Sequence, residues 1–149
     1  MGLTDFDILL RSLAAYMAGA ASLAYTGTPR AVWVHAAVDR DAAAVCSVVR
    51  QFGGAVPWTP VAEAEVQVRT TALNGNVTGA FAQATALFGS LFDASGRPLR
   101  NAMILTSATP GAGIRVNAAD CRQPPSFVDF DDRGRANVVF NFTVKAVPV

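Results

Sequence analysis

The chain has 149 residues, of which 52% are hydrophobic and 15% charged, and its formal net charge is +1. A chain of this length buries roughly 70% of its unfolded surface and needs no disulfide or metal to fold, so we expect a single domain over residues 1–149. Lys145 is the only lysine. The low charge argues against sequence-specific nucleic-acid binding, and a weakly polar surface favours burial against partner proteins.

The apolar run from Ile8 to Tyr25 lacks the flanking residues of a membrane span or a secretory signal. Arg11 interrupts the run, and Asp5 and Asp7 precede it where a signal peptide carries basic residues. We therefore expect a cytosolic chain with no membrane-spanning segment.

The first third of the chain predicts a helix and two strands. Thr4 is the expected N-cap of a helix that ends between residues 18 and 26, with an apolar face formed by Phe6, Leu9, Leu10, Leu13 and Met17. Residues 31–38 alternate as a strand, and residues 44–51 predict a second strand that pairs with the first as a hairpin. The following GGAVPWTPVA is expected to be a loop, in which Trp58 either contacts a partner or packs over the sheet edge.

Residues 65–91 hold the clearest two periodicities. Residues 65–71 alternate between polar and apolar as in a half-buried strand, and the turn Asn74-Gly75-Asn76 follows. Apolar residues then recur at steps of three and four: Val77, Ala80, Phe81, Ala84, Leu87, Phe88 and Leu91. The pattern predicts a central strand and a helix that covers the sheet.

The segment after this helix predicts more strands. Residues 102–106 form a short apolar run that is typical of a central strand, and residues 113–118 predict another strand. Residues 120–125 are expected to be a loop.

The C-terminal segment predicts a hairpin of residues 126–131 and 135–147. The turn Asp131-Asp132-Arg133-Gly134 fits a type I turn with glycine at the left-handed position. The predicted fold class is α+β, an α/β sandwich with a mostly antiparallel or mixed sheet that two helices cover on one face.

Few residues have the pattern of a catalytic site. His35 is the only histidine, and its predicted strand offers no paired nucleophile. Cys46 and Cys121 belong to no C-x-x-C pair and are expected to be free, buried thiols. We therefore expect no catalytic residues and no cofactor.

The acidic run before Gly134 partly resembles a calcium-binding loop. It contains Asp129, Asp131 and Asp132, but Arg133 stands where a third oxygen ligand is needed and Phe140 where the terminal glutamate is needed. A polar hairpin turn is therefore the expected structure, with no metal.

The order of several short motifs points to a known family. A leading amphipathic helix is followed by the strand AVWVHAAV, by Gly-Gly before a proline-containing loop, and by VQVRT before a helix containing AFAQATALF. The segment QPPSFVDFDDRGRANVVFNFTV then has a turn ending in Gly-Arg before a long strand with Asn-Phe. In this order the motifs resemble the tail terminator proteins of long-tailed bacteriophages.

The resemblance implies an α/β fold and a structural role in the virion, not an enzyme. Such proteins form a hexameric ring at the head-proximal end of the tail, stop growth of the tube, and offer a docking surface to the head. The implied partners are further copies of the chain, the tail tube protein and the head-tail connector protein, assembled in the host cytoplasm. The alternatives are a head completion or connector protein of the same particle and a small α+β ligand-binding or enzyme domain.

A six-fold ring requires a heterologous interface, in which two different patches of each subunit meet. We expect these patches in the loop 53–60 and in the turn 131–135. Arginine suits an intersubunit ion pair because its planar group binds carboxylates with two hydrogen bonds. The candidate contact residues are Trp58, Arg69, Asp131, Asp132 and Arg135.

Overall fold

A computed structural model describes residues 3–54, 62–99, 103–106 and 113–148. In these residues the chain forms helices α1 (Leu3–Ala20) and α2 (Val77–Gly89). Short 3₁₀ turns, η1 (Asp39–Asp41) and η2 (Leu73–Gly75), precede β2 and α2. The strands are β1 (Arg30–Val34), β2 (Ala42–Gly54), β3 (Ala62–Ala72), β4 (Met103–Thr106), β5 (Gly113–Phe130) and β6 (Ala136–Pro148).

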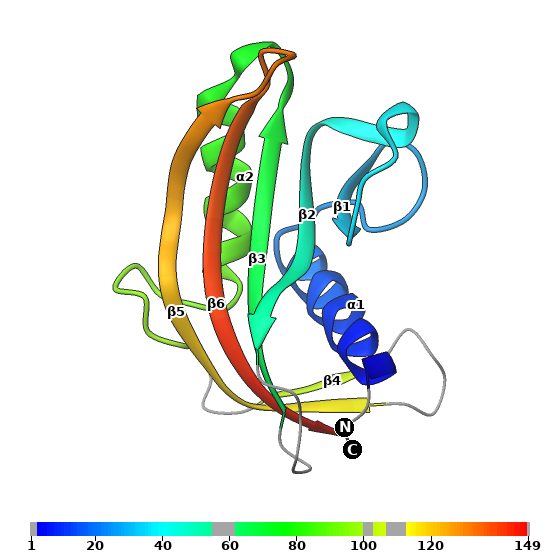
Figure 1. Cartoon of the computed structure of the whole chain (residues 1–149), viewed down its shortest axis with the longest axis vertical. Coiled ribbons are helices and arrows are strands. Elements are labelled where there is room, and N and C mark those ends of the chain that lie inside the picture. The colour runs from blue at the N-terminus through cyan, green and yellow to red at the C-terminus, as the bar shows by residue number, and fades with distance from the viewer. Residues whose placement is uncertain (1–2, 55–61, 100–102, 107–112, 149) are drawn as a thin grey trace.

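The strands form one mixed sheet in the order β1-β2-β3-β6-β5-β4. Only β1 and β2 run parallel, and every other neighbouring pair is antiparallel. The VQVRT segment lies in β3, between β2 and β6, so its central position is confirmed. Figure 1 shows β5 and β6 bending, so that β4 and the first part of β5 pass close to the start of α1.

Both helices cover the same face of the sheet, as predicted, and the core lies between the two layers. β6 contributes alternate residues that are almost fully buried: Val138, Phe140, Phe142, Val144 and Ala146. The ring of Phe88 on α2 meets Phe140 edge to face at 5.5 Å, and Phe92 meets Phe142 at 5.9 Å. Such pairs contribute about 0.5–1.5 kcal/mol each beyond their burial, so they fix α2 over β6. These features confirm the α+β class.

The predicted hairpin between residues 31–38 and 44–51 is wrong, because β1 and β2 are parallel. β1 ends at Val34, where Ala36 N–H donates back to the Val34 carbonyl at 2.8 Å and His35 adopts a left-handed φ of 67°. The chain then returns through η1 before it enters β2. Strand alternation fixes which side chains share a face but not the direction of pairing.

Two predictions for the C-terminal half are also wrong. The strand within 102–106 is not central, because β4 lies at the sheet edge and the long β5–β6 hairpin fills the interior. Residues 120–125 are not a loop but belong to β5. Shifts of register between Cys121 and Ser126 accompany the prolines in this stretch, as expected where residues without an N–H enter a strand.

The helix ends differ slightly from their predicted positions. α1 begins at Leu3, so Thr4 lies inside the helix and is not its N-cap, whereas its end at Ala20 is within the predicted range. α2 ends at Gly89, although Leu91 beyond it is buried as the periodicity predicted. In the described part of the chain, no helix has the length and apolar content needed to cross a bilayer.

Candidate contact surface

The turn between β5 and β6 is closed by the carboxylate of Asp131. Its Oδ1 accepts hydrogen bonds from the backbone N–H of Arg133 at 2.9 Å and of Arg135 at 3.0 Å. Gly134 donates its N–H to the Asp131 carbonyl at 2.8 Å and has a φ of 71°, which glycine adopts without steric cost. The predicted left-handed glycine is confirmed, and the turn holds its own side chains in place.

An ion network joins this turn to the connection before β2. Arg135 Nε lies 2.7 Å from Asp131 Oδ2, and Arg133 Nη1 lies 3.0 Å from Asp39 Oδ2. Arg135 Nη1 also lies 3.9 Å from Asp39 Oδ1. Desolvation acts to raise the pKa of Asp131, but the hydrogen bonds and charge of Arg135 and the N–H of Arg133 outweigh it, so this pKa is lowered. The carboxylate is therefore ionised at neutral pH.

A shallow cleft of about 200 Å³ lies beside this network, and its lining includes Asp39, Cys46, Leu73 and Arg135. Burial raises the pKa of the Cys46 thiol, although the nearby Arg135 charge acts in the opposite direction. A thiol with a raised pKa is protonated at neutral pH and is a poor nucleophile. Cys46 and Cys121 are free, as predicted, but both are half-buried and not fully buried as expected.

The structure gathers some of the predicted contact residues and separates others. Asp131 and Arg135 pair within the turn, and Asp132 beside them is exposed. Arg69 instead lies on the uncovered face of β3, paired in register with Val139, and its buried Nε has no hydrogen-bond partner in the described structure. Trp58 and most of its loop lie outside the described residues.

The uncovered face of the sheet carries polar side chains bonded across neighbouring strands. Arg50 donates to Gln67 Oε1 through Nη2 at 2.6 Å, and Asn141 Nδ2 donates to Gln123 Oε1 at 2.8 Å. Thr71 Oγ1 donates to Asn137 Oδ1 at 2.9 Å, and Asn137 Nδ2 donates to Asp129 at 3.0 Å. These hydrogen bonds link neighbouring strands. They also satisfy polar groups of Gln67 and Asn137, which are buried although no helix covers this face of the sheet.

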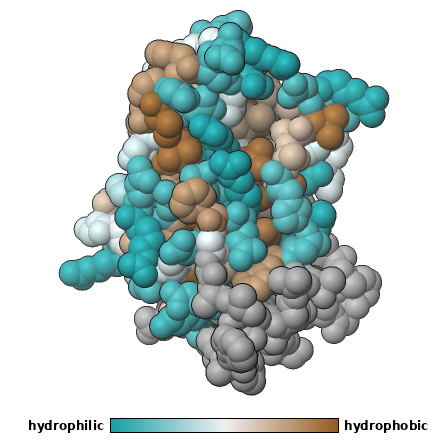
Figure 2. All heavy atoms as spheres, in the orientation of Figure 1, coloured by the Kyte–Doolittle hydropathy of each residue, from teal (hydrophilic) through white to brown (hydrophobic). Residues whose placement is uncertain are grey.

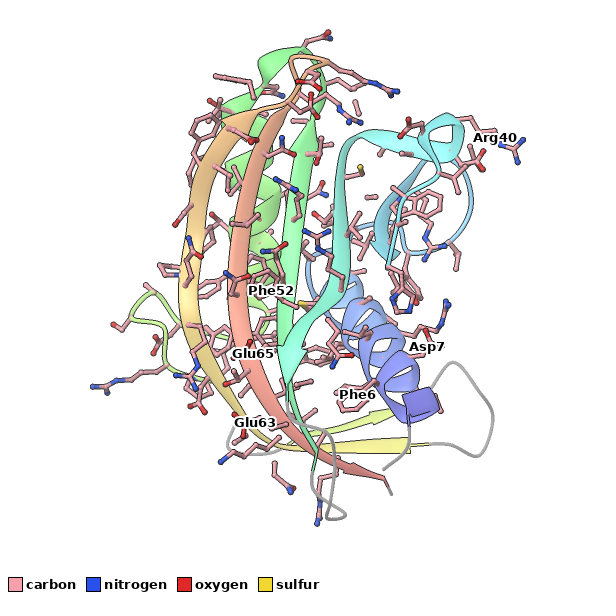
Figure 3. The ribbon with its side chains drawn as sticks, viewed as in Figure 1. Phe6, Asp7, Arg40, Phe52, Glu63 and Glu65 are labelled. Carbon is pink, nitrogen blue, oxygen red and sulfur yellow. The ribbon has the colours of Figure 1, made fainter. Side chains whose placement is uncertain are left out.

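A hollow of about 410 Å³ opens on this same face, next to Phe52, Glu65, Arg122 and Asn141. Phe52 is 63% exposed, and Figure 3 shows it on the ribbon of β2 above Glu65. A register shift between Gln51 and Gly53 coincides with this position. The sequence did not indicate Phe52, because the predicted strand ended at Gln51, one residue before it, whereas β2 continues to Gly54.

Apolar side chains gather at the hairpin end of the molecule. Of the seven large hydrophobic side chains exposed in the described part, four lie here: Leu73, Phe127, Val128 and Phe130. The rings of Phe127 and Phe130 lie 5.1 Å apart, and a Cβ built on Gly75 would lie 3.6 Å from the Phe130 ring. Figure 2 shows hydrophobic surface over the upper part of β5. We call these four residues the apolar hairpin end.

Asp7 and His35 form a second polar contact that the sequence analysis missed. His35 Nε2 lies 2.6 Å from Asp7 Oδ1, and Arg11 Nε lies 2.9 Å from Asp7 Oδ2. The hydrogen bond from His35 lowers the pKa of Asp7; burial acts against it, and Arg11 adds to the lowering. Among the described residues, the His35 ring bonds to no hydroxyl or thiol, so the contact ties α1 to the end of β1 without a nucleophile.

Comparison with known proteins gives no family assignment. The chain matches no protein-family model and no curated protein sequence. Within the ranges that the structure describes, no group of three or more His, Cys, Asp and Glu side chains is placed to hold a metal ion. The apolar hairpin end and the adjoining ion network form the candidate contact surface.

Proposed function

We propose that this chain is a structural protein of a bacteriophage virion, a tail terminator that forms a hexameric ring at the head-proximal end of the tail tube. The observation that carries the proposal is the apolar hairpin end, a set of exposed Phe, Val and Leu side chains next to a fixed ion network. The motif order described above supports the same role. In this role the ring ends polymerisation of the tube and contacts the head-tail connector.

The hairpin end has the physical character of a protein contact. Exposed aromatic side chains that lie together are frequent centres of binding energy, and charged groups around them give orientation. Phe127, Val128 and Phe130 of this end lie on β5, and Leu73 lies on η2. β5 pairs with β6, whose core-facing side chains are almost fully buried, so a contact built on this end rests on the core of the sheet.

Genetic removal tests the role directly. Particles made without this gene are expected to carry tails of uncontrolled length when imaged by electron microscopy, because nothing ends tube growth. Normal free tails beside heads that leak DNA would contradict the terminator role and assign the chain to head completion.

Asp132→Lys is the sharper probe of the ring contact. Arg135→Glu would also break the pairing with Asp131 and Asp39, so a loss of assembly there would not separate contact from local folding. Asp132 is exposed, and its replacement leaves those pairs intact. The matched control is Asp120→Lys, which reverses an exposed charge on β5 far from the turn.

Native mass spectrometry and tail-length measurement are the readouts. We expect Asp132→Lys to weaken ring formation and to lengthen tails, and Asp120→Lys to resemble the wild type. If both variants assemble and cap tails normally, the turn does not form the ring contact.

A further inference from the structure

We propose that residues 126–130 of β5 accept an extended segment of a partner protein, which adds to the sheet as a further strand and carries basic residues between apolar ones. The segment shares Phe127, Val128 and Phe130 with the apolar hairpin end, but the inference does not require that the chain ends a tail tube. Peptide binding tests the sheet edge, and tail length tests the role in the virion.

The sheet is open on this side of β5. β4 pairs only with Gly113–Val116, and among the described residues no strand pairs with the outer side of the rest of β5. The connection after α2 approaches the middle of β5, where a Cβ built on Gly96 would lie 3.6 Å from Cys121. Pro124 and Pro125 have no N–H to donate. Beyond these prolines, Ser126–Phe130 continues β5 to its end, with a shift of register against β6 between Phe127 and Asp129, and no described strand pairs with its outer side.

The opposite edge of the sheet is closed by the chain itself. The Val32 N–H donates to the Ala24 carbonyl at 3.0 Å, and the Val32 carbonyl accepts from Arg30 Nε at 2.7 Å. The Val34 carbonyl accepts from Ala36 N–H at 2.8 Å. Because these groups are already used, β1 of a second copy is a poor strand to lay against β5. Two copies of the edge 126–130 would bring their own aspartates together, which is unfavourable, so a different protein is the favoured partner.

The side chains along the open edge define the chemistry of the partner. Phe127, Val128 and Phe130 are exposed, and the two rings pack together as a ready apolar surface. From Phe127 to Asp132 the sequence has three aspartates and no basic residue. Asp131 is neutralised by Arg135, whereas Asp129 and Asp132 form no ion pair within the described part of the chain.

Strand addition suits these observations. An added strand satisfies the free backbone groups of the edge, and alternate side chains supply the specificity. Apolar residues of the partner strand would lie beside Phe127 and Phe130, and its basic residues would lie near Asp129 and Asp132. The charge complementarity selects a basic, apolar segment over an acidic one.

Peptide binding to the full chain tests the proposal. The probe is an octapeptide of alternating Val and Lys, and its matched control alternates Val and Glu. In a titration followed by backbone NMR, we expect the Val/Lys peptide to shift and protect the amides of Ser126–Phe130. The Val/Glu peptide is expected to bind at least about tenfold more weakly, because two or more ion pairs are lost. Equal affinity for both peptides, or shifts confined to other strands, would overturn the proposal.

Two exposed phenylalanines give a matched pair of variants. Phe130→Ser is expected to weaken binding of the Val/Lys peptide strongly, whereas Phe52→Ser, on the uncovered face of the sheet, is expected to leave it unchanged. Circular dichroism checks that both variants fold. If Phe130→Ser does not fold, Asp129→Lys serves in its place, because it reverses an exposed charge and should weaken binding of the same peptide.

Self-association is the competing outcome. If the chain alone forms dimers whose assembly protects the amides of Ser126–Phe130 and is lost in Phe130→Ser, a second copy occupies the edge. That result would overturn the assignment to a different partner protein.

Discussion

Asp131 shows how one side chain holds the hairpin turn. Its carboxylate accepts two backbone N–H groups and the Arg135 guanidinium, so three donors converge on one residue. The sequence predicted the turn from its glycine. The donors around Asp131 became visible only in the structure, because their convergence depends on the path of the backbone.

The lowered pKa of Asp131 predicts an acid-sensitive contribution to stability. Its folded pKa lies below its ordinary value of 3.8, so the ionised carboxylate stabilises the fold above that value, and the contribution is lost as the pH falls through the folded pKa. Urea unfolding between neutral pH and about pH 2.5 should therefore show a smaller acid-induced loss of stability in Asp131→Asn than in the wild type. Identical pH profiles would contradict this assignment.

Removal of the Ser12 hydroxyl is expected to stabilise the fold. Its hydroxyl is buried on α1, the residue is 2% exposed, and its Oγ has no hydrogen-bond partner in the described structure. A buried hydroxyl without a partner costs about 1–3 kcal/mol, so Ser12→Ala should raise the free energy of unfolding by about 1 kcal/mol.

Ser47→Ala is the matched control for this prediction. The Ser47 hydroxyl is also buried but bonds to Thr70 Oγ1 at 2.7 Å and to Gln83 Nε2 at 3.0 Å. Its removal should lower the free energy of unfolding by about 1 kcal/mol, because it leaves polar partners unpaired. Denaturant melts of both variants check the two signs, and a loss of stability in Ser12→Ala would contradict the first.

A short polar segment leads into helix α2. Asn74 and Gly75 have left-handed φ values of 57° and 67°, which turn the chain from β3 into the helix. Asn76 then caps α2, and its side-chain oxygen accepts from the Gly79 N–H at 3.0 Å. The sequence placed both the turn and the helix start correctly, since Asn and Gly are the residues that this geometry prefers.

The cap predicts a measurable contribution to stability. Asn76→Ala should lower the free energy of unfolding by about 1 kcal/mol, whereas Asn76→Asp should retain it, because a carboxylate accepts the same N–H. Thermal melts of the two variants, compared with the wild type, check the difference. Equal losses in both would show that packing and not the cap decides the start of α2.

Across the molecule, resistance to local unfolding should be highest in the middle of the sheet. β3 and β6 lie next to each other, and alternate residues of both point into the core. Opening these strands requires separation of the helices from the sheet, whereas the outer side of residues 126–130 is not covered by another described strand. The difference sets an order of local unfolding.

Hydrogen exchange followed by mass spectrometry or NMR measures that order. We expect the amides of β3 and β6 to exchange slowest, and those of residues 126–130 that point away from β6 to exchange at least about a hundredfold faster. Strong protection of these edge amides in a dilute, monomeric sample would contradict the open edge.

Local residue patterns were enough to predict the elements with the clearest periodicity. Period-two and period-3.6 patterns are local, so β3, α2 and the alternating face of β6 followed from the residues alone. The left-handed glycine of the β5–β6 turn followed in the same way, since its conformation depends on a few neighbouring residues.

Long-range contacts, which no local pattern records, set the direction of β1 against β2, the edge position of β4 and the continuation of β5 through Pro124 and Pro125. It also decided the pairing of Asp39 with Arg133 and the exposure of Phe127 and Phe130. Each of these depends on contacts between segments far apart in the chain, whose competing arrangements satisfy the same local patterns. The candidate contact surface is therefore a property of how the sheet is assembled, because its residues come together only when β5, β6 and the connection before β2 meet.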